Sequence, residues 1–121
     1  MPLKITLYII ISLLLHSEGF SQVENKVEPQ YKHGSKKDMH QFIKNNVSYP
    51  NGVCIEGKVY TKVFIDSLGN ITDVQIIRGI EEHANEEAIS VIRLLEFIPG
   101  KINGIPKKMK IIIPVSFTIE R

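Results

Sequence analysis

The sequence predicts an α+β fold, α-β-β-α-β in chain order, with a small three-stranded antiparallel sheet and helices on one of its faces. Residues 58–65 and 109–119 place apolar or β-branched side chains at every second position, the period of a strand with one buried face. Residues 36–46 and 86–95 repeat apolar side chains at helical spacing. A chain of 121 residues makes one domain at most, which we expect over residues 35–121.

The N-terminus is predicted to be a secretory signal peptide over residues 1–21. A basic start precedes an almost wholly apolar run over residues 5–15, and the small residues Gly19 and Ser21 precede a cleavage point before Gln22. The apolar run has about half of the ~20 residues that a membrane-spanning helix needs. We therefore expect export and cleavage. Retention of the segment as an inner-membrane anchor is the alternative.

A polar linker and a first helix are expected next. Residues 22–34 have no apolar period and are predicted to be a disordered linker. Ser35 can cap a helix, with Asp38 three residues on as its partner in a capping-box-like pair. A short apolar stripe over residues 39–43 marks the buried face of this helix, which is expected to end by Asn46.

The following segment is predicted to be an antiparallel hairpin. Residues 59–65 form its first strand, and residues 71–78 form the return strand. The residues between the strands supply turn chemistry, in which Gly69 or Asn70 takes a positive φ.

An amphipathic helix follows the hairpin. Asn85 is expected to cap its N-terminus, and the two glutamates after it lie on the positive end of the helix dipole. The apolar stripe over residues 88–95 is expected to face the sheet, and Pro99 stops the helix.

The last strand, from Met109 to Ile119, is expected at an edge of the sheet. It contains Pro114, which has no N–H to give to a neighbouring strand, so it belongs at an edge or at a bulge. An edge strand leaves backbone groups free to pair with another segment.

Composition and motif spacing argue against chemistry and against nucleic-acid binding. The formal net charge is +2 and the cations are spread along the chain, so no nucleic-acid footprint is expected. Cys54 is the only cysteine, which excludes an intrachain disulfide. The four histidines do not stand at metal-ligand spacing, and the glycines do not form a phosphate-binding loop. We therefore expect no metal, no cofactor and no enzymatic activity.

Several segments resemble, in order and spacing, the C-terminal domain of TonB, the energy transducer of Gram-negative envelopes. The resemblance extends over most of the chain, from about Gly34 to Ile119. Its segments are Tyr49-Pro50, Ile55 to Asp66, Leu68 to Ile71, Glu86 to Ala88, Phe97 to Gly104 and Ile113 to Phe117. One departure is the stretch 51–54, where the commoner form of the family has a short helix.

The resemblance implies a periplasmic, peptide-binding role in TonB-dependent transmembrane transport, without bond chemistry. In that family an extended peptide, the TonB box of an outer-membrane receptor, adds a strand beside the last strand of the sheet. Most apolar side chains of this strand are expected in the core, so that only their backbone groups would bind. The implied peptide-binding residues are Tyr49, Pro50, Ile111, Ile112, Ile113, Val115, Ser116 and Phe117.

Two features leave an alternative open. Ser12 and His16 have the Ser-x-x-x-His spacing of the family's membrane anchor, so contact with the membrane is expected only if residues 1–21 are retained. The short tether formed by residues 22–37 argues against a complete transducer. The alternative is a freestanding envelope adaptor or structural module that pairs with itself, or dimerises, through the same edge without transducing energy.

Overall fold

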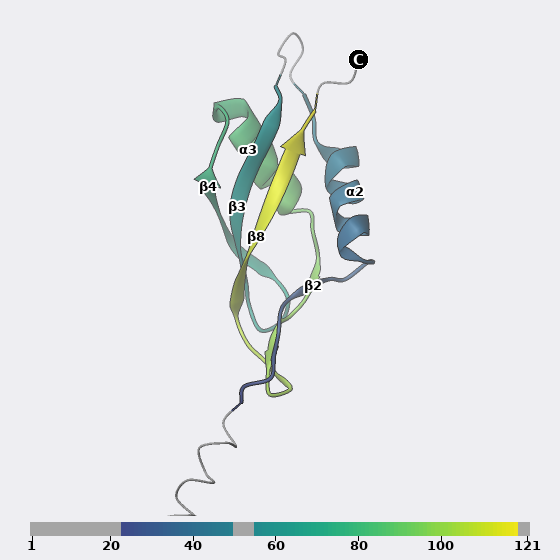
Figure 1. Cartoon of the computed structure of the whole chain (residues 1–121), viewed down its shortest axis with the longest axis vertical. Coiled ribbons are helices and arrows are strands. Elements are labelled where there is room, and N and C mark those ends of the chain that lie inside the picture. The colour runs from purple at the N-terminus through teal and green to yellow at the C-terminus, as the bar shows by residue number, and fades with distance from the viewer. Residues whose placement is uncertain (1–22, 50–54, 119–121) are drawn as a thin grey trace, which may run out of the picture.

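A three-stranded antiparallel sheet in the order β4-β3-β8 organises the fold (Figure 1). The computed structural model describes residues 23–49 and 55–118. The strands of this sheet are β3 (Gly57–Ile65), β4 (Ile71–Arg78) and β8 (Met109–Phe117). With the helices α2 (Lys36–Asn46) and α3 (Glu82–Ile92), they have the predicted order α-β-β-α-β. The predicted α+β class is confirmed.

Both helices pack on the same face of the sheet and enclose one hydrophobic core. Val59, Val63 and Ile65 of β3 are buried, and the half-buried residues between them face the other way. α3 packs against β3 and β4, whereas α2 packs against β8. Figure 1 shows β3 and β8 in front of α3, with the uncovered face of the sheet toward the viewer. The buried core residues are Met39, Ile43, Ile55, Val59, Val63, Ile65, Val74, Ala84, Ala88, Val91, Ile92, Leu95, Phe97, Ile113, Val115 and Phe117.

The N-terminus of α2 forms the expected capping box. The Asp38 N–H donates to the Ser35 hydroxyl (3.2 Å), and the Asp38 carboxylate accepts from the Ser35 N–H (2.8 Å) and hydroxyl (2.9 Å). Two backbone donors at the start of the helix are thereby satisfied. The hydrogen bond from the Ser35 N–H, and then that from its hydroxyl, lower the pKa of Asp38 from its ordinary value.

The start of α3 differs from the prediction. Its N-cap is Glu81, whose carboxylate accepts the backbone N–H of Ala84. Asn85, the expected cap, lies inside the helix, and its side-chain oxygen accepts the Ile80 N–H (3.1 Å). Both side chains carry an acceptor oxygen that can cap backbone donors, so the sequence alone did not separate them.

The end of α3 also differs from the prediction. The last helical residue is Ile92, before the expected stop at Pro99. The N–H groups of Leu94 and Leu95 donate to carbonyls three residues back, which tightens the final turn. Leu95 is buried although it lies outside the helix, because this tighter turn keeps its side chain on the core side.

The segment expected to be a disordered linker, residues 22–34, carries two short strands. β1 (Lys26–Val27) pairs with β6 (Lys101–Ile102), and β2 (Gln30–Tyr31) pairs with β5 (Phe97–Ile98). β7 (Ile105–Pro106) pairs with β6 on its other side. Strands of two residues have no period to detect, and their partners lie far away in the sequence, so the local pattern did not predict them.

Some sequence predictions lie outside the described residues. These are the signal peptide over residues 1–21 with its cleavage before Gln22, the position of Pro50, and the state of Cys54. In the described part of the chain, none of the helices has the length and apolar character needed to cross a membrane.

Candidate functional site at the open edge of β8

β8 is an edge strand of the sheet, as its proline predicted. It pairs with β3 in one uninterrupted register, from Gly57 opposite Phe117 to Ile65 opposite Met109. Among the strands that the structure describes, none pairs with the other side of β8. Pro114 lies opposite Tyr60 in this register and can remain in the strand because its missing N–H is not needed by β3.

Three observations identify the backbone groups of β8 that face outward. In an antiparallel pair, the N–H and C=O of one residue point to the same side, and that side alternates along the strand. The buried Thr61 hydroxyl donates to the Ile113 carbonyl (2.8 Å), so Ile113 faces β3. Pro114 has no N–H to give to β3, and the Thr118 N–H donates away from β3, to the Tyr49 hydroxyl (2.9 Å). The residues of β8 that face outward are therefore Lys110, Ile112, Pro114 and Ser116, and Thr118, just beyond the strand, continues the series.

The six β8 residues predicted to bind a peptide fall into two sets. The odd-numbered residues from 111 to 117 are buried or partly buried against the core. They also turn their backbone groups toward β3, which corrects the expectation that these groups would be open to a partner. Ile112 and Ser116 are exposed, 61% of Ile112 being accessible, and each has an outward N–H and C=O.

Tyr49 lies at the C-terminal end of the same edge. Besides accepting the Thr118 N–H, it places its ring edge-on against Phe117, with ring centroids 5.7 Å apart and an interplanar angle of 85°. The N–H of the preceding Ser48 donates to the Glu87 carboxylate (2.8 Å), which ties this segment to α3. Two predicted site regions that are distant in the sequence are thus brought together.

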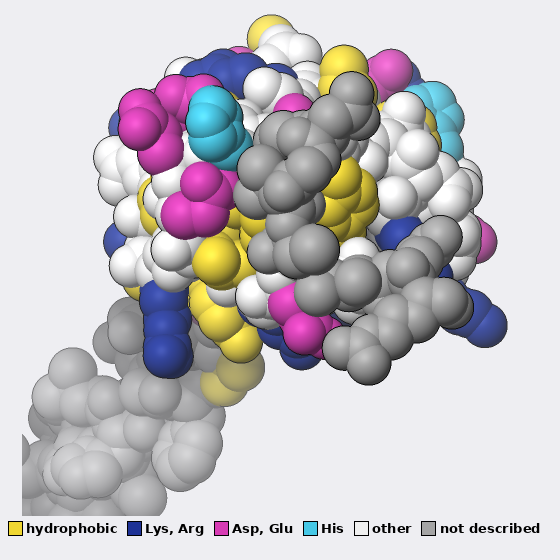
Figure 2. Space-filling view, turned by 90° about the horizontal axis from the view of Figure 1, so that it is seen from above, with side chains coloured by type: hydrophobic (Ala, Val, Ile, Leu, Met, Phe, Trp, Pro, Cys, Tyr) yellow, Lys and Arg dark blue, Asp and Glu magenta, His cyan; other side chains and the backbone are white. Residues whose placement is uncertain are grey.

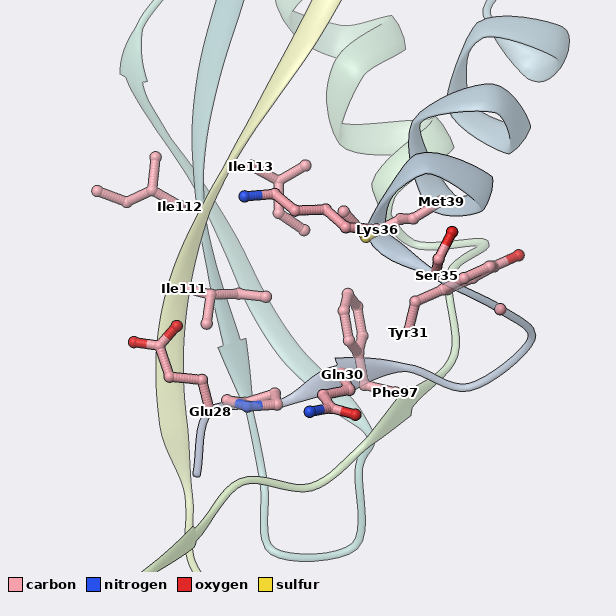
Figure 3. A pocket seen from close by; sticks show the side chains of 12 residues that line it. Glu28, Gln30, Tyr31, Ser35, Lys36, Met39, Phe97, Ile111, Ile112 and Ile113 are labelled. Carbon is pink, nitrogen blue, oxygen red and sulfur yellow. The ribbon is translucent and has the colours of Figure 1, made fainter. Parts of the chain in front are cut away.

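Two hollows, together called the groove, lie along the outer edge of β8, and the one beside Ile112 is lined by both apolar and polar side chains (Figure 3). Phe97 and Ile111 point into this hollow, between β8 and β2, whereas Ile112 points to the opposite side of β8. Lys36 extends from α2 toward β8 above the hollow, and Glu28 lies at its lower rim. An extended segment beside Ile112 could bury an apolar side chain here.

The half of the groove beside Ser116 is basic. Lys37 and Lys44 of α2 and Lys58 of β3 line it, together with His40 and the outward residues of β8. An acidic run lies elsewhere: four glutamates fall within residues 81–87, around the start of α3, and Figure 2 shows a cluster of Asp and Glu side chains on one side of this end of the molecule. The charge along the groove therefore changes from mixed to positive.

The groove offers groups that bind a chain, namely open backbone donors and acceptors, a partly apolar hollow and lysines. Within residues 23–49 and 55–118, no three His, Cys, Asp or Glu side chains lie together in a way that could hold a metal ion.

The sequence did not predict the walls of the groove. Lys37 and Lys44 stand on the polar face of a helix, where lysines are ordinary solvent-exposed residues. Phe97 was named only as the start of the segment, residues 97–104, that resembles the family. These residues have a local pattern without any special signal, and their role becomes visible only when α2 and β5 are placed beside β8.

The family model of the Gram-negative bacterial TonB protein C-terminal domain matches residues 53–119, more than half of the chain. The chain is similar in fold to the TonB C-terminal domain of Helicobacter pylori, whose structure was determined in solution by NMR. That similarity has a TM-score of 0.50 at 20% sequence identity and covers 75% of this chain and 90% of the other. No curated protein matches the chain.

Proposed function

This chain belongs to the family of the Gram-negative bacterial TonB protein C-terminal domain, and we propose that it binds the TonB box of an outer-membrane receptor by strand addition to β8. The proposed setting is the periplasm, after cleavage of the N-terminal segment. The family serves transport and is not one of enzymes, and the proposed role is therefore binding in TonB-dependent transmembrane transport.

The open backbone groups of Ile112 and Ser116 are the observation that carries this proposal. A strand added to a sheet edge gains main-chain hydrogen bonds, and alternate side chains set its register. Ile112 and Ser116 are four residues apart, which is roughly 13 Å along a strand, so a segment of about five residues spans both. Pro114, between them, contributes only an acceptor, its carbonyl.

The two halves of the groove support a partner of defined chemistry. A segment paired with β8 turns every second side chain toward the same side of the sheet. The partner side chains next to the one opposite Ile112 meet the hollow lined by Phe97 and Ile111, which favours apolar residues there. Beside Ser116 the neighbouring lysines favour an acidic residue. The proposed partner is an extended segment that is apolar at one end and acidic at the other.

The position of α2 favours a single extended segment over a second copy of the chain. α2 packs against β8, and its side chains line the groove beside the outward residues of that strand. A second copy that paired through its own β8 would bring its own α2 into the same space. Self-pairing, the adaptor alternative, is therefore kept as an outcome of the experiment.

Residue-specific amide exchange by NMR tests the proposal. The probe is a synthetic peptide with aspartate at one end followed by valines and isoleucines, and its control has asparagine in place of aspartate. We expect the aspartate peptide to slow exchange at Ile112 and Ser116 and to leave the turn at residues 67–70 unchanged. Binding on the order of micromolar is enough, because a short peptide loses much freedom on ordering. The asparagine peptide should bind more weakly.

A pair of variants separates the backbone from the side chain of Ser116. Ser116→Pro removes an outward N–H and should weaken peptide binding by roughly tenfold or more, the effect of losing one good hydrogen bond, with a smaller effect on folding. Ser116→Ala keeps the N–H and should bind as the wild type does. Protection confined to residues 36–49, or undiminished binding by Ser116→Pro, would place the site elsewhere. Protection of Ile112 and Ser116 by dimerisation alone would favour the adaptor.

A further inference from the structure

The first outward donor beyond the end of β8 already has a partner within the chain. The Thr118 N–H, next in the series after Ser116, donates to the Tyr49 hydroxyl at 2.9 Å. An added strand lies about 4.8 Å from its neighbour and accepts such a donor through a carbonyl oxygen. The hydroxyl oxygen of Tyr49 therefore takes the place of that carbonyl oxygen.

Two contacts outside the edge hold Tyr49 in this position. Its ring packs edge-on against Phe117, which is buried in the core with 1% of its surface exposed. The N–H of Ser48 donates to the Glu87 carboxylate of α3. The side chain is thus oriented by the sheet on one side and by a helix on the other, although 41% of Tyr49 remains accessible.

We propose that Tyr49 ends the strand-addition edge of β8 and thereby sets the length and register of the bound segment. This inference rests on the proposed binding of an extended peptide to β8. With Thr118 occupied, a partner strand can pair with the outward residues from Lys110 to Ser116 and stops there. A longer segment gains no further backbone bond at that end, and a segment shifted toward Thr118 loses its bonds to Ile112.

Tyr49→Phe is the matched variant for this inference, because it removes only the hydroxyl and keeps the ring that packs on Phe117. In the protein without peptide, the Thr118 amide should exchange roughly three- to tenfold faster in Tyr49→Phe than in the wild type, the effect of losing one hydrogen bond of ordinary net strength. The Ile112 and Ser116 amides should exchange equally in both proteins.

The dependence of affinity on peptide length is the second measurement. If Tyr49 only stabilised the fold, Tyr49→Phe would not change this dependence. The aspartate peptide is compared with two longer versions, each extended by two alanines at one end. In the wild type, neither extension should change affinity by more than about twofold. In Tyr49→Phe, one extension should strengthen binding by roughly three- to tenfold and should slow exchange at Thr118. The end at which it does so also gives the direction of the bound strand.

The outcomes separate this inference from the function on which it rests. If the peptide protects Ile112 and Ser116 but one extension strengthens binding equally in both proteins, Tyr49 does not set the end, and the proposed function stands. Equal Thr118 exchange in the two peptide-free proteins also overturns the inference. If no peptide protects β8 in either protein, the proposed function and the register role are both rejected.

Discussion

The two edges of the central sheet differ in regularity and in whether their outward backbone groups are free. β3 pairs with β8 without a shift in register, whereas its pairing with β4 shifts twice, between Tyr60 and Thr61 and between Phe64 and Ile65. Val74 of β4 lies opposite Val63, whose backbone groups point toward β8, so the Val74 N–H faces outward. That N–H donates to the Asp73 carboxylate (2.9 Å). The β4 edge is irregular and partly closed by its own side chain.

The difference teaches how a small sheet can keep one edge for binding. Bulges and charged side chains are the usual means of preventing unwanted pairing at an edge, and β4 has both. β8 is regular and leaves Lys110, Ile112 and Ser116 open, and its edge is closed by Tyr49 at Thr118, just beyond the strand. The free backbone groups of this edge are confined to one stretch beside α2. A site that accepts a short extended segment is expected to have its free groups confined in this way.

α3 packs against β3 and β4, whereas α2 packs against β8, so a change in α3 should alter stability without altering peptide binding. This prediction has the largest expected effect. Ala88 of α3 is fully buried and lies on the face that packs against β3 and β4. Ala88→Leu should overpack this interface and lower the free energy of unfolding by roughly 1–3 kcal/mol. Peptide affinity at β8 should stay within about twofold, since α2 and not α3 lines the groove. Urea denaturation and peptide titration measure the two quantities.

Ser90→Leu is the control for Ala88→Leu, because it adds the same side chain to the exposed side of the same helix. Its free energy of unfolding should change by less than about 0.5 kcal/mol. A large loss of peptide affinity in Ala88→Leu at temperatures where it is folded would mean that the two edges are not independent.

The two edges also differ in how far their features could be predicted from the sequence. Pro114 placed β8 at an edge, and the alternation of β3 placed the core, because both signals are local. The capping box of Ser35 and Asp38 was predicted for the same reason. The contact of Tyr49 with Thr118 and the pairing of β1 and β2 join residues that are distant in the sequence. Such contacts depend on how the elements are placed in space, which no local period describes.

Removing the Asp73 carboxylate, which accepts the outward Val74 N–H, should leave that backbone donor of the β4 edge free, as the outward donors of β8 are. Asp73→Ala leaves the outward Val74 N–H without its acceptor, and the Val74 amide should exchange roughly three- to tenfold faster. Asp73→Asn keeps an acceptor oxygen at the same place and should leave the exchange of Val74 nearly unchanged. NMR exchange of the two variants decides the point. Equal exchange in Asp73→Ala and the wild type would mean that the carboxylate does not close this edge.

The smallest expected effect concerns the pH dependence of α2, which borders the β8 edge only. Hydrogen bonds from Ser35 lower the pKa of Asp38 below its ordinary value of 3.8. A folded-state pKa below the unfolded one means that the ionised carboxylate stabilises the fold fully above about pH 4, and that this contribution is lost as the pH falls through the folded-state pKa. Asp38 is fully exposed, so solvent screening keeps the contribution small.

Asp38→Asn measures this contribution, because it removes the charge and keeps a side chain of the same shape. Its free energy of unfolding should lie below that of the wild type at pH 6, and the difference should shrink below pH 3.8 as the wild-type carboxylate becomes protonated. Chemical denaturation at several pH values gives both curves. Relative to the intrinsic exchange rate at each pH, the protection of α2 amides should decrease with falling pH in the wild type, whereas the protection of Val74 at the opposite edge should not change. A difference between wild type and variant that stays constant with pH would show that the charge of Asp38 does not stabilise the helix beside the open edge.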